Sequence, residues 1–330
     1  NDPKRMLACA AVVAGLALAA SGSPAMAAGA DYKGFFVALD LATTQPTGVD
    51  QTSAVLVNPA NGFTTRDMID NDADFSWAIK AGYSWGELGG LEASYWSFDN
   101  DQTENHVDNV NYVYPTVFGQ YGYNYATSYG LTAPVTYKTT SGIKASVIDI
   151  DYFRAMDVGE RFTIKWLAGL RSASYTEDQG FSSDTTALTY YIESKHIDSD
   201  AFGVKVGALL SFGFTDRFAL QGKMAFSFLQ GDIQSERTRN ASGLNFDQVS
   251  ADTDNVRGEI RDYDLRGVWM WENLDVYLGY GGQTWDGLVT DPLGSGGCCA
   301  ASTGNTESGS RDSIGFNSLH AGVVLRFGKH

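Results

Sequence analysis

Charged residues that could do chemistry are spaced at even intervals in two neighbouring segments. Asp149 and Asp151 are separated by one apolar residue, and Lys165 and Arg171 follow in the next segment. Two carboxylates on one face of a strand could act as an acid–base pair. We assign Lys144, Lys165 and Arg171 to the same face as the aspartates. This favours a ladder of mixed charges that lines or fills an enclosed interior.

A second candidate for chemistry is the pair Ser318 and His320, two residues apart. A serine nucleophile needs a hydrogen-bonded base and a third group that orients the base. The sequence identifies no such third group. His106 and His196 lie in polar segments, where a solvated histidine is the simpler interpretation. We therefore predict no catalytic residues and no enzyme activity.

Metal and cofactor sites are not predicted. Residues 70–74 begin like a calcium-binding loop, but Phe75 stands where that loop needs glycine and Ala81 where it needs a bidentate glutamate. Cys298 and Cys299 are adjacent, so they cannot join distant parts of a fold. A vicinal disulfide, an intermolecular bridge and a pair without function remain open for them, and we prefer the last.

Composition and the first residues indicate where the chain resides. The formal charge of −16 argues against nucleic acid as a partner. Lys4 and Arg5 precede an apolar run over residues 6–20, and residues 25–27 form a small-x-small cleavage signal. We predict a signal peptide over residues 1–28 and one mature domain over residues 29–330. The apolar run is too short for a transmembrane helix.

The elements that must position the charges are strands, because bulky apolar residues alternate with small or charged ones. Over residues 75–85, for example, Phe75, Trp77 and Ile79 alternate with Ser76, Ala78 and Lys80. A soluble β-sandwich also alternates. However, here the bulky set is aromatic and the other set is small or ionic, which is typical of strands with lipid outside and a polar lumen inside.

Connections between the ten predicted strands alternate in length. Tight turns are predicted near residues 87, 158, 216 and 273, and long polar stretches over 43–73, 100–141, 177–199, 231–256 and 287–313. Short periplasmic turns and long outer loops are typical of outer-membrane barrels. We therefore predict an all-β, antiparallel up-and-down transmembrane β-barrel of ten strands. It would have twelve if residues 100–141 contain another hairpin.

We predict that the barrel is a passive pore or narrow channel for small solutes. The lumen of ten or twelve strands is slender at best. Charged residues on its inner face would set the local potential and the constriction. The candidate pore-lining residues are Lys80, Glu92, Asp149, Asp151, Lys165, Arg171, Lys205, Lys223, Asp264, Arg266 and Arg326.

The alternative is a structural or adhesive barrel whose long acidic outer loops bind a partner or a surface. The expected partners are outer-membrane lipid, lipopolysaccharide and small solutes or ions, and a homo-oligomer is left open. The solute, the ion selectivity and the oligomeric state do not follow from the sequence.

Several strands together resemble a known family. Residues 147–152 (VIDIDY) and 165–171 (KWLAGLR) resemble paired strands of the Legionella-type major outer membrane protein family. Residues 202–231 resemble its next hairpin, and residues 316–327 its last strand. The resemblance covers about the C-terminal two-thirds of the chain. It implies a pore-forming β-barrel in the outer membrane of a Gram-negative bacterium.

Overall fold

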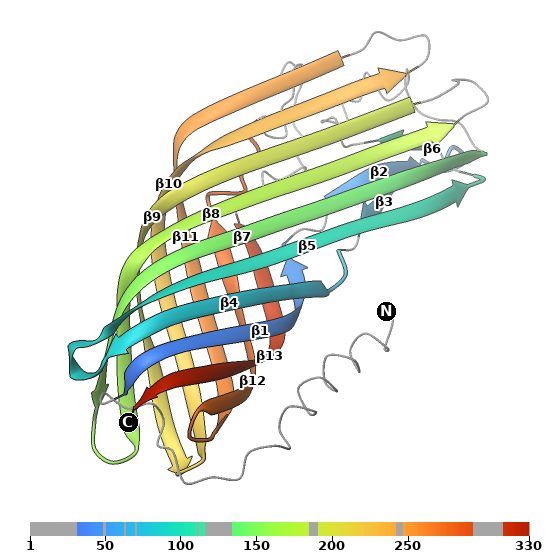
Figure 1. Ribbon diagram of the computed structural model, residues 1–330. Coiled ribbons are helices and arrows are strands. Elements are labelled where there is room, and N and C mark those ends of the chain that lie inside the picture. Colours follow the sequence, from blue (N-terminus) through green and yellow to red (C-terminus); the bar gives the residue numbers. More distant parts are fainter. Residues whose placement is uncertain are drawn as a thin grey trace.

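The computed structural model describes residues 32–48, 51–62, 64–69, 71–110, 112–115, 134–184, 191–241, 247–292 and 313–329 (Figure 1). The predicted signal peptide and the Cys298–Cys299 pair lie outside these residues. Among the described residues, no helix is long and apolar enough to cross a membrane.

Ten antiparallel strands form a closed barrel, which confirms the predicted fold class and the lower of the two strand counts. The order around the barrel is β1-β13-β12-β11-β10-β9-β8-β7-β5-β4, and β4 pairs with β1. The strands are β1 (Lys33–Thr47), β4 (Asp74–Trp85), β5 (Gly90–Asp108), β7 (Val135–Asp157), β8 (Phe162–Asp184), β9 (Tyr191–Thr215), β10 (Phe218–Ala241), β11 (Asp247–Met270), β12 (Leu274–Asp286) and β13 (Ser313–Lys329).

The four predicted tight turns join β4 to β5, β7 to β8, β9 to β10 and β11 to β12, all at one end of the barrel. The first contains a single 3-10 turn, η1 (Gly86–Leu88). Its closing residue, Gly89, has φ of 88°, and a Cβ there would lie 2.2 Å from the carbonyl oxygen of Phe153. Glycine is therefore required at this turn. We call this the turn end of the barrel.

Bulky side chains cover the outside of the barrel, as β10 illustrates. Its outward residues Leu220, Met224, Phe226 and Phe228 expose 39–60% of their surface. Beyond Phe228 the outward positions become polar, ending the apolar band after a length close to the 9–11 residues that cross hydrocarbon. The apolar face therefore meets lipid, and the inner face is enclosed.

Five strands continue far beyond the apolar band. Strands β7 to β11 contain 23–25 residues each, whereas β4 and β12 contain 12 and 13. A strand of about 24 residues at a tilt near 45° rises about 55 Å, roughly twice the height of the hydrocarbon layer. With the far half of β5, these strands form a tall wall on one side of the barrel, at the end opposite the turn end (Figure 1).

Two segments predicted to be loops belong to this wall. Residues 177–199 and 231–256 are mostly strand, belonging to β8, β9, β10 and β11. Outside lipid a strand needs no apolar face to keep its hydrogen-bond ladder, so the alternation that marks the lower strands is absent there. The hairpin considered within residues 100–141 is also corrected. That stretch contains β6 (Tyr112–Pro115), but β6 joins β2 (Gln51–Val57) and β3 (Thr64–Ile69) in a separate sheet, order β3-β2-β6.

Candidate functional site in the lumen

All eleven residues predicted from the sequence to line a pore lie on the inner face of the barrel. They are not spread evenly around an open channel. Instead all of them except Lys223 form ion pairs with one another or with inner residues that the sequence analysis did not name. They occupy two regions along the barrel axis, one near the turn end and one farther from it.

The outer region is a closed ion layer, made of Asp149, Asp151, Arg171, Lys205 and Asp262. Arg171 donates to both carboxylate oxygens of Asp149 at 2.7 and 2.9 Å. Its third nitrogen lies 2.9 Å from Asp262, three strands away around the barrel, as an ion pair without hydrogen-bond alignment. Lys205 donates to Asp149 and Asp151 at 2.6 Å each. These side chains are buried, so the ion layer crosses the lumen rather than lining it.

The inner-face residues between the ion layer and the turn end form a second region, which we call the lower lumen. Glu92 joins two cations there, accepting from Lys165 at 2.6 Å and from Lys80 at 3.0 Å. The Lys165 ammonium group also lies 3.7 Å from the centre of the Phe153 ring, a cation–π contact. These bonds connect β4, β5 and β8 across the inside of the barrel.

A second group in the lower lumen is centred on His320. Its Nδ1 lies 3.0 Å from Asp40, and its Nε2 lies 3.0 Å from Asp264. Tyr277 donates its hydroxyl to Asp40 at 2.7 Å, and Arg266 lies 3.6 Å from Asp264. Nearest the turn end, Arg326 pairs with Asp275.

Ser318 and His320, which were considered as a nucleophile and its base and not predicted to be catalytic, are not brought together. Ser318 shares a hydrogen bond of 2.7 Å with Thr44, while both imidazole nitrogens of His320 face carboxylates. No nucleophile–base contact exists between them. Asp149 and Asp151 are likewise held by Arg171 and Lys205, which supports the mixed-charge ladder over the acid–base pair. Within the described ranges, no group of histidine, cysteine and acidic side chains is arranged to hold a metal ion.

The assignment of Lys144 to the same face as Asp149 and Asp151 was wrong. Lys144 lies an odd number of positions from Asp149 on β7 and therefore points outward. Its side chain is 54% exposed and lies 3.7 Å from Asp99. The predicted ladder keeps Lys165 and Arg171 but loses this residue.

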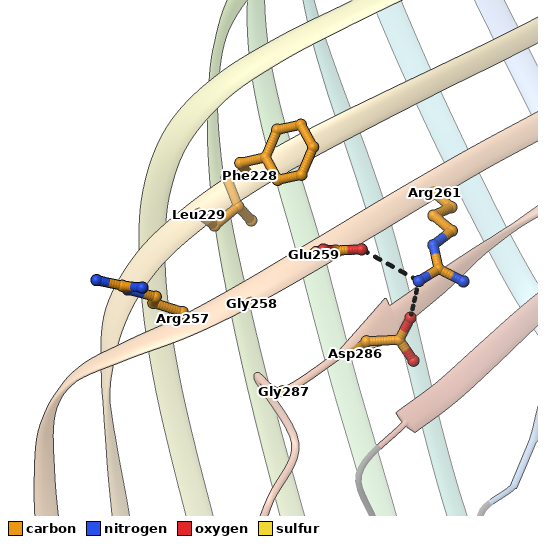
Figure 2. A pocket seen from close by; sticks show the side chains of 8 residues that line it. All are labelled: Phe228, Leu229, Arg257, Gly258, Glu259, Arg261, Asp286 and Gly287. Carbon is orange, nitrogen blue, oxygen red and sulfur yellow. Dashed lines mark hydrogen bonds and ion pairs between the residues drawn. The ribbon is translucent and has the colours of Figure 1, made fainter.

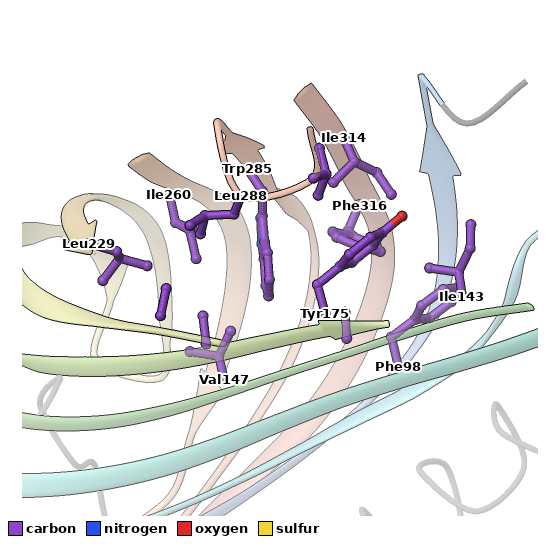
Figure 3. Packing of buried hydrophobic residues seen from close by; sticks show 14 residues of the cluster. Phe98, Ile143, Val147, Tyr175, Leu229, Ile260, Trp285, Leu288, Ile314 and Phe316 are labelled. Atoms are coloured by element: carbon purple, nitrogen blue, oxygen red, sulfur yellow. The ribbon is translucent and has the colours of Figure 1, made fainter. Parts of the chain in front are cut away.

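An apolar layer closes the lumen above the ion layer (Figure 3). Trp285 of β12 lies 6.4 Å from Tyr175 of β8 and 5.7 Å from Phe316 of β13, measured between ring centres. Phe316 also contacts Phe98 of β5 at 5.4 Å. Because β8 and β12 are four strands apart, these rings meet across the lumen. The other members are Ile143, Ala145, Val147, Ala173, Ala201, Leu229, Ile260, Leu288, Val289 and Ile314.

A buried cluster of charges, the wall cluster, lies above the apolar layer. Asp291 accepts from Ser235 at 2.9 Å and pairs with Arg237, and Lys195 lies 3.6 Å away. Lys195 also pairs with Glu177 at 3.3 Å. Burial alone would raise the pKa of Asp291, but the charges of Lys195 and Arg237 and the hydrogen bonds it accepts hold its pKa below the ordinary value.

A groove of about 660 Å³ opens where β12 ends and β11 continues into the wall (Figure 2). Arg261 pairs there with Glu259 at 3.1 Å and with Asp286 at 3.2 Å. Phe228, Leu229, Arg257, Gly258 and Gly287 complete the lining. The outward face of β11 continues from Tyr263 through Arg261, Glu259 and Arg257. The lipid-facing side of this strand therefore leads into a charged segment.

Comparison with known proteins identifies the family. The family model described as the Legionella pneumophila major outer membrane protein precursor matches residues 32–260. The chain belongs to this family. The match includes the resembling segments at 147–152, 165–171 and 202–231 but not the last strand, so it lies nearer the N-terminus than the resemblance suggested. As a family member, the protein is an outer-membrane β-barrel of a Gram-negative bacterium.

Solved barrels resemble this family member only distantly. The outer membrane protease OmpT from Escherichia coli has a TM-score of 0.46 and 10% identity, covering 89% of this chain and 97% of that one. The Ralstonia pickettii toluene transporter TbuX has a TM-score of 0.26 and 10% identity, covering 91% and 90%. The CymD monoaromatic hydrocarbon channel has 0.27 and 8%, with the same coverage. No curated protein sequence matches.

In the ion layer and around His320 and Arg326, sequence reasoning missed the inner residues Asp40, Asp262, Asp275 and Tyr277. Each carries a signal that would have found it, because each has the same parity as a recognised inner residue or the opposite parity to a lipid-facing one on its strand. Asp262, for example, lies two residues from Asp264. His320 also lies on the inner face, and its two carboxylate partners could not be read from the sequence.

Proposed function

We propose that the protein is a passive channel of low conductance for small polar solutes. The observation that supports this most is the ionic lower lumen. Ionisable groups at membrane depth are costly and usually belong to a functional path. In the ion layer and the lower lumen together, seven cationic side chains and seven carboxylates share the inner face of the described strands. The cations are Lys80, Lys165, Arg171, Lys205, Lys223, Arg266 and Arg326, and the carboxylates are those of Asp40, Glu92, Asp149, Asp151, Asp262, Asp264 and Asp275.

Accessibility inside the barrel supports a path in the lower lumen. The side chains of Lys80, Lys165 and Asp40 expose 32%, 23% and 23% of their surface. An inward side chain of a closed barrel can expose surface only to the lumen, so the lower lumen has room for water. The ion layer and the apolar layer above it form the constriction. Passage requires side chains of these layers to move, which accounts for a low conductance.

Single-channel recording in planar bilayers tests this proposal. We expect refolded protein to give discrete, small current steps, well below those of 16–18-stranded porins with their aqueous channels. A matched preparation of detergent without protein should give none. Repeated insertion without steps, in protein whose folding is verified by its heat-modifiable migration on gels, would contradict a channel.

The tall wall supports the second candidate, a barrel that binds a partner or a surface. Strands β7 to β11 are about twice as long as a bilayer requires, and the wall cluster stiffens their inner face. Acidic outward residues, such as Asp178, Asp200 and Asp232, favour a cationic surface. Proteoliposomes carrying the protein should then adhere to aminosilane-coated glass, and adhesion should fall when these aspartates are changed to asparagine. Adhesion equal to that of empty vesicles would exclude this candidate.

Lipopolysaccharide contact is a proposal of the same kind. Arg257 and Arg261 lie directly beyond Tyr263 of the lipid-facing face, at the expected height of lipid headgroups. The Arg257→Gln protein should retain less lipopolysaccharide on purification than the wild type. Equal retention would remove this groove as the contact.

A further inference from the structure

One inner cation of the barrel lacks the partner that the others have. Lys223 lies on the inner face of β10, opposite Asp264 of β11 and Leu209 of β9. In the part of the chain that the structure describes, no carboxylate lies within ion-pair distance of its ammonium group. The other six cations of the ion layer and lower lumen each have a carboxylate within 4 Å.

The carboxylate opposite Lys223 is already engaged. Asp264 faces His320 at 3.0 Å and Arg266 at 3.6 Å. Gln221, two residues from Lys223 on the same face, accepts from Arg266 at 3.1 Å. The neighbouring acceptors Asp264 and Gln221 thus contact other groups, and neither accepts a hydrogen bond from Lys223.

Burial makes a charge at this position costly. Lys205 and Lys80 add repulsion, whereas Asp262 and Asp149 attract the ammonium group. The two aspartates are held directly by Arg171 and Lys205. A cation inside a membrane barrel is tolerated when it is paired or hydrated. Lys223 is half-buried on the inner face, so it borders the lower lumen.

We propose that Lys223 is the centre of a binding site for a small oxyanion, the carboxylate or phosphate group of a solute in the lower lumen. Among the described residues, the three hydrogen-bond donors of the ammonium group have no acceptor, and an oxyanion supplies both the acceptors and the compensating charge. Lys80, with a third of its side chain accessible, adds a second positive charge nearby. This inference rests on the proposed channel and assigns its solute class.

Inorganic phosphate is the first probe, and binding is measured without conduction. We expect the ³¹P resonance of phosphate to broaden on addition of the protein refolded in micelles at pH 7. Lys223→Gln should weaken this binding about tenfold, the loss of a charge-assisted hydrogen bond of about 1.4 kcal/mol. Lys144→Gln is the matched control, because it makes the same change on the outer face of β7 and should leave binding unchanged.

A second variant and a competing ligand separate the outcomes. Lys223→Arg retains the charge and should retain phosphate binding, so the test does not depend on whether Lys223→Gln folds. Acetate should compete with phosphate for the wild-type protein. Equal broadening by wild type and folded Lys223→Gln, or none by the wild type, would overturn the oxyanion site. Broadening that is lost in Lys223→Gln, in a protein that never conducts, would support the site and reject the channel.

Discussion

Two charged regions of the same lumen differ in how completely they are closed. In the ion layer, Arg171 and Lys205 each expose 2% of their side chains, whereas Lys80 and Lys165 in the lower lumen expose 32% and 23%. Both regions contain lysine or arginine paired with carboxylates. The difference lies in their surroundings. Arg171 and Lys205 lie next to the apolar layer, whereas Lys80 and Lys165 expose surface in the lower lumen, although their partner Glu92 is 3% exposed there.

This difference indicates a division of roles. Buried ion pairs cost desolvation, and removing one partner leaves an uncompensated charge. Accessible pairs are screened by water and exchange partners easily. The ion layer is therefore the structural part of the lumen, and the lower lumen is the part that can bind solutes.

Arg171→Met should give the largest effect. It leaves Asp149 and Asp262 buried with one partner fewer, and we expect a loss of about 3–5 kcal/mol in the free energy of unfolding. Lys80→Met in the lower lumen should cost no more than about 1 kcal/mol, because Glu92 keeps Lys165. Urea unfolding in lipid vesicles measures both values. Equal losses would remove the distinction between the two regions.

Trp285→Ala tests the closing role of the apolar layer. Trp285 is fully buried, and its removal should cost about 3 kcal/mol and raise the single-channel conductance severalfold. Trp269, which is 56% exposed on the lipid side of β11, is the matched control. Trp269→Ala should leave the conductance unchanged. A Trp285→Ala channel with wild-type conductance would mean that the constriction lies elsewhere.

Asp291→Asn extends the comparison to the wall cluster. The pKa of Asp291 is lower in the folded protein than in the unfolded chain, so its charge stabilises the fold above the unfolded pKa of about 4. This contribution is lost as the pH falls through the lower, folded-state pKa. We expect a cost of about 1–2 kcal/mol at pH 7 that disappears in acid. Unfolding of both proteins from pH 7 to pH 3 measures it, and a cost independent of pH would be contrary to this assignment.

Lys144→Gln should give the smallest effect. Its ion pair with Asp99 is exposed on both sides, so the free energy of unfolding should change by less than about 0.5 kcal/mol. A loss comparable to that of Arg171→Met would show that exposure does not separate paired charges in this barrel.

The sequence predicted the strands and the turn end well, because alternation and turn residues are local properties. Lys165, Arg171 and Lys205 were assigned to the inner face by parity alone, and the structure places them there. Their partners were predictable only in part. Asp149 belongs to the predicted ladder with Arg171, but Arg171 also reaches Asp262 three strands away, and such contacts depend on how the barrel closes. The wall was missed for a different reason. Beyond lipid the outward residues of β10, such as Asp232 and Glu236, are polar, so the strand carries no apolar alternation there.

Labelling two neighbouring residues of β4 tests the central claim that ionic side chains face an enclosed interior and bulky ones face lipid. Cysteines replacing Ile79 and Lys80, in a Cys298→Ser and Cys299→Ser background, would each carry a fluorophore in vesicles. Brominated lipid should quench the probe at position 79 strongly and the probe at position 80 weakly. A water-soluble quencher should act in the opposite order. Equal quenching of both positions by brominated lipid would contradict the account.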